Sequence, residues 1–208
     1  MTEPRLLALL DQADAIARRA GETLVQMQGA ELNVARKELN DVVTAADLAS
    51  ERLVIEGLRA LTPGAAILSE EAGFSGSHEA PRWIVDPLDG TVNYASGLPW
   101  FSVTMAYQEQ GRTLLGLTYA PRAGLSARFA EGGIASVDGR PAQVSATTRL
   151  RDAVVSICLT SHYTAAETDR TCKVIRRLAG LCRGVRVIVS GGLEISLVAA
   201  GRLDAFIG

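Results

Sequence analysis

The segment Trp83–Tyr94 reads WIVDPLDGTVNY and sets two carboxylates, Asp86 and Asp89, three positions apart directly after an apolar run. We expect residues 82–85 to form a buried strand, so that Asp86 emerges at its carboxyl end, where open α/β sheets bind ligands. The proline and the glycine of the motif then turn the backbone sharply, because proline fixes φ and glycine adopts conformations closed to other residues. Both carboxylates and the carbonyl of Leu88 then face one point.

Oxygen ligands of this kind suit a hard cation such as Mg²⁺, which shares its remaining positions with water and substrate phosphate. Asp-Pro and Asp-Gly are also common turn dipeptides, so residues 86–90 taken alone also fit an ordinary loop. A second apolar run, residues 65–68, leads directly into Glu70 and Glu71. If the two strands are neighbours, Glu70 joins the two aspartates in one pocket, which favours a metal site.

A third acidic segment, Asp41–Asp47, reads DVVTAAD. Thr44 and Asp47 have the spacing of a capping box at the start of a helix. Taken alone, this segment indicates helix capping.

Composition excludes several classes of function. The 208 residues carry a formal net charge of -2 with both signs interspersed, so there is no broad basic field for a nucleic-acid polymer. The three cysteines follow no metal-binding spacing, which indicates reduced thiols and a cytoplasmic location. Residues 1–27 match neither a signal peptide nor a membrane span. We therefore expect a soluble, unprocessed chain that binds no membrane.

The hydrophobic pattern changes along the chain and predicts an α/β protein. The first half reads as α+β, with two helices on an antiparallel-rich sheet, and the second half alternates strand and helix. We expect a metal-binding domain over residues 1–145 and a substrate-side domain over 146–208. The predicted helices are 4–28, 44–61, 165–181 and 193–200; the predicted strands are 65–68, 82–85, 101–107, 114–119, 125–129, 154–159, 185–189 and 204 onward.

In this order the motifs resemble the inositol monophosphatase family of Mg²⁺-dependent, lithium-sensitive phosphatases. The matching segments are Asp41–Asp47, Glu70–Glu71, the DPLDGTxNY motif at Asp86–Tyr94 and Gly191–Ala205. The resemblance implies the layered αβαβα sandwich of inositol monophosphatase and fructose-1,6-bisphosphatase. It also implies a hydrolase that acts on a small phosphorylated metabolite, and a homodimer.

The resemblance implies roles for the acidic residues and their neighbours. Glu70, Asp86 and the Leu88 carbonyl would hold a first Mg²⁺, and Asp86 with Asp89 would contribute to a second, in a site of two or three ions. Two such ions roughly 4 Å apart clamp the attacking and leaving oxygens of a displacement at phosphorus. The implied catalytic residues are Asp47, Thr91 and Glu70, with Thr91 bonded to Asp47 so that it orients the attacking water.

The resemblance also implies contacts to the substrate. Backbone N–H groups at Gly90 and Thr91 would meet the phosphate. The implied substrate contacts are Asp89, Gly90, Thr91, Ser190 and Gly191, with Thr160 or Ser161 and a looser match at Lys37. The two histidines, His78 and His162, have no fitting nucleophile nearby, and we expect both at the surface.

The sequence departs from the family at its end. The W-D-x-A-A-G motif, whose aspartate completes the second metal site, is absent, so the C-terminal part appears incomplete. We expect a portion of a longer chain, because a terminal apolar strand leaves an open sheet edge. The alternative is a shortened, non-catalytic member that binds metal or ligand. Gly208 stands where inositol-preferring members carry a glutamate.

The leading expectation is therefore a Mg²⁺-dependent phosphomonoesterase that hydrolyses a small sugar or inositol monophosphate by attack of a metal-activated water. Within the same family, 3'-phosphoadenosine 5'-phosphate, fructose 1,6-bisphosphate and histidinol phosphate are alternative substrates. The sequence does not choose among them.

Overall fold

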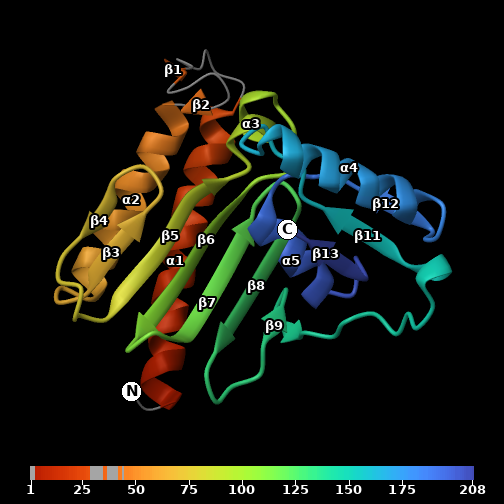
Figure 1. Cartoon of the computed structure of the whole chain (residues 1–208). Coiled ribbons are helices and arrows are strands. Elements are labelled where there is room, and N and C mark those ends of the chain that lie inside the picture. Colours follow the sequence, from red (N-terminus) through yellow and green to blue (C-terminus); the bar gives the residue numbers. More distant parts are fainter. Residues whose placement is uncertain (1–2, 29–34, 37–41, 44) are drawn as a thin grey trace.

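The computed structural model describes residues 3–28, 35–36, 42–43 and 45–208, and these form five layers (Figure 1). The first layer holds α1 (Glu3–Met27) and α2 (Ala45–Leu61), which pack against a large eight-stranded sheet. Helix α5 (Gly191–Ala199) separates this sheet from a small three-stranded sheet. Helix α4 (Ala165–Ala179) covers the far side of the small sheet. The predicted αβαβα order is confirmed.

The large sheet is almost wholly antiparallel, and its one parallel pair decides where the acidic residues meet. The strand order is β10-β9-β8-β7-β6-β5-β3-β4. Its strands are β3 (Ala66–Ser69), β4 (Gly73–Ser75), β5 (Arg82–Asp89), β6 (Ser102–Glu109), β7 (Arg112–Ala120), β8 (Leu125–Ala130), β9 (Ser136–Val137) and β10 (Arg140–Pro141). Strands β3 and β5 are parallel neighbours, so both end at the same edge of the sheet.

Strand β5 is longer than the predicted 82–85. Its pairing with β6 continues from Asp86 opposite Thr104 to Asp89 opposite Ser102, with one extra residue on β5. This is a β-bulge, which bends the strand and re-aims the side chains beside it. The short helix α3 (Thr91–Ala95) follows immediately.

The small sheet has the order β12-β11-β13, with both pairs parallel. Its strands are β11 (Val154–Ile157), β12 (Gly184–Arg186) and β13 (Ala205–Ile207), and the 3₁₀ turn η1 (Leu150–Asp152) precedes them. The predicted strands 154–159 and 185–189 are therefore shorter in the structure. The division into two domains near residue 145 stays a prediction.

The core lies between α1, α2 and the large sheet. Leu6, Leu10, Ala13, Ala17 and Leu24 recur on one face of α1 and are buried there, as the helical spacing predicts. Two buried aromatic side chains also bond to the helix layer: Trp83 Nε1 donates to Thr62 Oγ1 at 2.9 Å, and the Tyr94 hydroxyl donates to the Leu24 carbonyl at 2.7 Å.

Strands β1 (Ala35–Arg36) and β2 (Val42–Val43) form a separate antiparallel pair. The residues Lys37, Asp41 and Thr44, named above for possible roles, lie outside the described residues. None of the helices in the described part of the chain has the length and hydrophobicity that a membrane span requires.

Candidate active site

A cavity of about 450 Å³ lies where β3, β5 and β11 end. One wall is acidic and the opposite wall consists of the segments that follow β11 and β12. The lining residues include Glu70, Glu71, Asp86, Leu88, Asp89, Gly90, Thr91, Asn93, Cys158, Thr160, Ser161, His162, Val189 and Gly191. The predicted convergence of Glu70, Asp86 and Asp89 on one cavity is thus present in the structure.

Asp86 is the most perturbed group in this cavity. Burial, reinforced by the charges of Asp89 and Glu70, raises the pKa of Asp86 from 3.8 to about 9. A hydrogen bond from Leu88 N to Asp86 Oδ1, 3.1 Å long, opposes this rise in pKa only in part. Asp86 is also close enough to Glu70 for a hydrogen bond between their side chains. The hydrogen bonds of the wall therefore do not fully compensate the negative charge of its carboxylates. A proton or a cation relieves the remaining repulsion.

Asp89 joins the acidic wall to the start of α5. Its Oδ2 atom accepts hydrogen bonds from the Ser102 and Ser190 hydroxyls at 2.8 and 2.7 Å, from Gly192 N at 2.9 Å and from Leu193 N at 3.4 Å. From the described residues, its Oδ1 atom accepts one bond, from Gly191 N at 3.0 Å. Oδ2 is therefore saturated, whereas Oδ1 retains a lone pair for a further partner.

These donors fit a hard divalent cation. Asp86, Glu70 and the Leu88 carbonyl offer only oxygen, and the pKa of Asp86 is raised by burial and by neighbouring carboxylate charges, which a cation neutralises. The Leu88 carbonyl accepts the Thr91 hydroxyl at 2.9 Å, and a carbonyl oxygen has two lone pairs. No three Asp, Glu, His or Cys side chains in the described part of the chain are already arranged as a complete metal site.

Gly90 fixes the turn between β5 and α3. Its φ is +90°, and a Cβ at this position would lie 2.6 Å from the Trp100 carbonyl oxygen. Only glycine fits both the left-handed conformation and this close approach. The backbone of the motif therefore requires glycine at position 90, independently of the carboxylate of Asp89.

Helix α2 supplies the residues behind the acidic wall. Asp47 is 3% exposed near the start of α2, and its predicted hydrogen bond to Thr91 stays a prediction. Glu51, one turn further along, accepts hydrogen bonds from Ser69 Oγ at 2.5 Å and from Ala72 N at 2.8 Å. Glu51 thereby holds the turn that carries Glu70. Sequence reasoning missed it, because a glutamate inside an amphipathic helix normally faces water.

Asn93 is a second residue that the sequence analysis did not single out, although it belongs to the quoted motif. Its Nδ2 atom lies within hydrogen-bonding distance of the carbonyls of Trp100 (2.9 Å), Ile188 (2.7 Å) and Val189 (3.3 Å). It thereby ties α3 to the segment that leads into α5.

The other predicted residues divide between the cavity and its surroundings. Gly191, Thr160 and Ser161 line the cavity, and Ser190 lies fully buried behind it. His162 is exposed as expected, but it also lines the cavity. His78 stacks on Phe74 with 4.2 Å between ring centroids, in a region that contributes nothing to the cavity wall.

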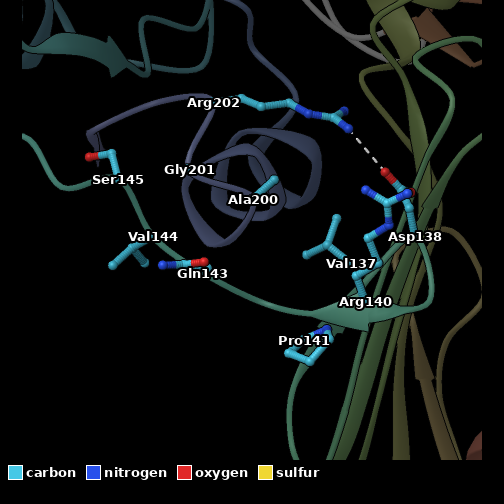
Figure 2. A pocket seen from close by; sticks show the side chains of 10 residues that line it. All are labelled: Val137, Asp138, Arg140, Pro141, Gln143, Val144, Ser145, Ala200, Gly201 and Arg202. Atoms are coloured by element: carbon cyan, nitrogen blue, oxygen red, sulfur yellow. Dashed lines mark hydrogen bonds and ion pairs between the residues drawn. The ribbon is translucent and has the colours of Figure 1, made fainter.

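A second cavity of about 580 Å³ lies between β9, β10 and the turn after α5 (Figure 2). Asp138 is its one carboxylate, and Arg202 pairs with it at 3.0 Å. With a single, already paired carboxylate on its wall, this cavity lacks the acidic cluster that marks the first one.

Comparison with known proteins gives consistent matches. The profile of the inositol monophosphatase family matches residues 6–208. The fructose-1,6-bisphosphatase/inositol-1-monophosphatase of Thermotoga maritima is 33% identical over 199 residues, which cover 95% of this chain and 74% of the relative. The inositol-1-monophosphatase of Mesorhizobium japonicum is 34% identical over 202 residues, covering 96% of this chain and 76% of the relative. The crystal structure of the extragenic suppressor protein SuhB from Bartonella henselae superposes with a TM-score of 0.89 at 31% identity, covering 96% and 77% of the two chains.

Proposed function

The chain belongs to the inositol monophosphatase family of phosphatases, and we propose that it hydrolyses a small sugar or inositol monophosphate in a Mg²⁺-dependent reaction. The observation that carries this proposal is the convergence of Glu70, Asp86 and Asp89 on one cavity, where burial, reinforced by the charges of Asp89 and Glu70, raises the pKa of Asp86 to about 9. Such crowding is costly unless a cation or a proton compensates it.

In this proposal, Glu70, Asp86 and the Leu88 carbonyl hold the first ion, and Asp86 with Asp89 Oδ1 contributes to a second. When bound, Mg²⁺ supplies charge that stabilises the phosphoryl oxygens and acidifies a water molecule. The saturated Oδ2 of Asp89 supports the assignment of Oδ1 as its only available ligand atom.

The remaining residues orient the reactants. Thr91 and Asp47 are proposed to position the attacking water and to accept its proton, with Gly90 and Thr91 N–H groups directed at the phosphate. The Thr91 hydroxyl donates to Leu88 O in the structure, which holds its oxygen next to the proposed metal ligands and supports this role. Gly191, Thr160 and Ser161 line the wall where the alcohol part of the substrate would lie.

The identity of the substrate is the more specific part of the proposal. The Thermotoga maritima relative is named for both fructose 1,6-bisphosphate and inositol 1-phosphate, which supports a sugar or inositol ester here. The alternatives within the family are 3'-phosphoadenosine 5'-phosphate and histidinol phosphate. A non-catalytic, metal-binding role is the alternative from another class.

We also propose a cytoplasmic homodimer. Cys158, Cys172 and Cys182 are all free, which suits a reducing compartment. Cell fractionation and sedimentation of the purified chain test these two points.

The function is tested by phosphate release from these esters, with and without Mg²⁺ and with added Li⁺. We expect Mg²⁺-dependent, Li⁺-inhibited release that falls roughly 100-fold, equivalent to about 2.7 kcal/mol, in Asp86→Asn. The matched control is Glu79→Asn, which alters an exposed acidic side chain outside the cavity and should retain full activity. If the purified chain binds Mg²⁺ but releases no phosphate from any ester, the non-catalytic role replaces the proposal.

A further inference from the structure

Glu194 is a fully buried carboxylate that the proposed reaction does not use. It lies on α5 with 0% of its surface exposed. Its Oε1 atom accepts the hydroxyl of Ser156 on β11, and its Oε2 atom accepts Ser190 N at 3.1 Å. No ion pair among the described residues involves Glu194, so hydrogen bonds alone compensate its burial. A polar group buried at this cost calls for a specific role.

The segment that Glu194 holds is strained. Val189 has a φ of +60°, and a β-branched residue in this region is a true conformational outlier. Asn93 Nδ2 lies within hydrogen-bonding distance of the Ile188 and Val189 carbonyls, and Glu194 accepts the N–H of Ser190, which belongs to the same peptide group as the Val189 carbonyl. Strain of this kind persists only where the surroundings enforce it, and it is common at functional sites.

Two carboxylates divide the N–H groups at the start of α5. Glu194 takes that of Ser190, while Asp89 takes those of Gly191, Gly192 and Leu193. The first N–H groups of a helix have no partner within the helix, so here each of them is satisfied by a side chain. The Ser190 hydroxyl also donates to Asp89 Oδ2 at 2.7 Å. Ser190 is therefore one of the four donors that saturate Asp89 Oδ2 and leave Oδ1 for the cavity.

We propose that Glu194 is a positioning residue for the acidic cavity. By holding Ser190 it keeps Asp89 Oδ2 bonded to α5 and leaves Oδ1 directed to the ion and the phosphoryl group. This inference rests on the proposed function. Without an acceptor at position 194, the buried Ser190 N–H loses its partner, the strained turn relaxes, and Asp89 loses its orientation.

The test compares three substitutions by their affinity for Mn²⁺, a paramagnetic ion with the same preference for oxygen ligands as Mg²⁺. Glu194→Met keeps the volume and removes the acceptor, and we expect about 10-fold weaker Mn²⁺ binding, measured by electron paramagnetic resonance of the free ion. Glu194→Gln retains both bonds, because its amide oxygen accepts Ser190 N and its amide donates to the Ser156 hydroxyl. We expect Mn²⁺ affinity within about twofold of the parent in this variant.

Ser196→Ala is the structural control. It removes a buried hydroxyl from the same helix, bonded to Gly192 O at 2.7 Å, and leaves Ser190 and Glu194 intact. We expect a lower melting temperature with unchanged Mn²⁺ affinity. If Glu194→Met binds Mn²⁺ as tightly as the parent, Glu194 has no positioning role.

If Glu194→Met does not fold, Ser156→Ala decides, because it removes the bond to Glu194 Oε1 and, besides that, a longer contact of 3.4 Å to the Arg186 carbonyl. About two- to threefold weaker Mn²⁺ binding supports the inference, and unchanged binding overturns it. Failure of the proposed function looks different, because the parent chain then releases no phosphate. If this parent still binds Mn²⁺, the comparison of the variants tests the positioning role as before, and if it binds no Mn²⁺, the positioning role falls too. A parent that binds Mn²⁺ and releases phosphate, with variants that match it, overturns the inference alone.

Discussion

The hydroxyl of Ser50 donates a hydrogen bond of 2.7 Å to the carbonyl of Pro87. Ser50 is fully buried on α2, one turn after Asp47, and Pro87 lies in the bulge between Asp86 and Asp89. This bond connects the helix that carries the proposed water-positioning carboxylate with the loop that carries the proposed metal ligands.

Ser50→Ala should therefore lower both stability and turnover. The substitution leaves the Pro87 carbonyl buried without its partner, at a cost of about 1–3 kcal/mol in the free energy of unfolding, measured in urea. We expect kcat to fall more than KM changes, because α2 shifts relative to Thr91. Ser77→Ala is the control, since Ser77 is exposed and its hydroxyl accepts a local bond of 3.3 Å from Glu79 N. Equal stability in the two variants contradicts this account.

Gly90→Ala should destabilise the turn into α3 strongly. A left-handed conformation alone costs a residue with a Cβ about 1–2 kcal/mol, and the contact of 2.6 Å with the Trp100 carbonyl adds to that cost. Gly97→Ala is the matched control, because its φ is also positive, at +75°, but nothing lies within 4 Å of the added Cβ. Urea unfolding should show a larger loss of stability in Gly90→Ala than in Gly97→Ala. Equal losses of stability would show that the contact with the Trp100 carbonyl relaxes without cost.

The stability of the metal-free protein should depend on pH through Asp86. Its pKa is about 9 in the folded protein against 3.8 ordinarily, so the folded state retains a proton that the unfolded state releases between these values. The contribution of this proton to stability is complete below about pH 3.8 and is lost as the pH rises through about 9. Because Mg²⁺ replaces the proton, stabilisation by Mg²⁺ should increase with pH.

Calorimetric melting at about pH 6 and about pH 8.5, with EDTA or with millimolar Mg²⁺, measures this dependence. Asp86→Asn is the control. In EDTA its melting temperature should lose the part of the pH dependence that this carboxyl group causes, and the rise in melting temperature with Mg²⁺ should be smaller. A Mg²⁺-induced shift in melting temperature that shrinks as the pH rises argues against Asp86 as a ligand.

Glu70→Gln removes a negative charge from the cavity, and we expect opposite effects on metal-free stability and on turnover. Glu70 is exposed, and its charge contributes to the raised pKa of Asp86. We expect the metal-free variant to melt slightly higher than the parent above about pH 7, because repulsion is reduced, while Mg²⁺-dependent turnover falls roughly 100-fold. Glu79→Gln is the matched control, with no change in either property. A variant that keeps parental turnover excludes Glu70 from the metal site.

The sequence predicted the layers and the acidic strand ends because their signals are local. Periodic apolar residues mark α1, and the run before Asp86 marks β5. The bulge was not predicted, because Pro87 reads as the end of a strand, whereas the pairing of Asp89 with Ser102 continues the ladder beyond it.

The hydrogen bonds around Asp89 were beyond sequence reasoning for a different reason. Their donors at Ser190 and Gly191 lie more than 100 positions away, and no local pattern couples them. The burial of Glu194 and Glu51 could not be predicted for the same reason. Each glutamate is a polar residue in the sequence, and it meets its hydrogen-bond partners only when the layers assemble.

The distance in sequence between Asp89 and its donors also sets an order of events during synthesis. A chain that has left the ribosome only as far as η1 already contains β3, β5 and the whole large sheet, but not the helix whose N–H groups hold Asp89. At that stage the acidic edge of the large sheet exists without α5. The three carboxylates are therefore synthesised before the helix that orients Asp89, and ions present in the cell meet them before Asp89 is held in place.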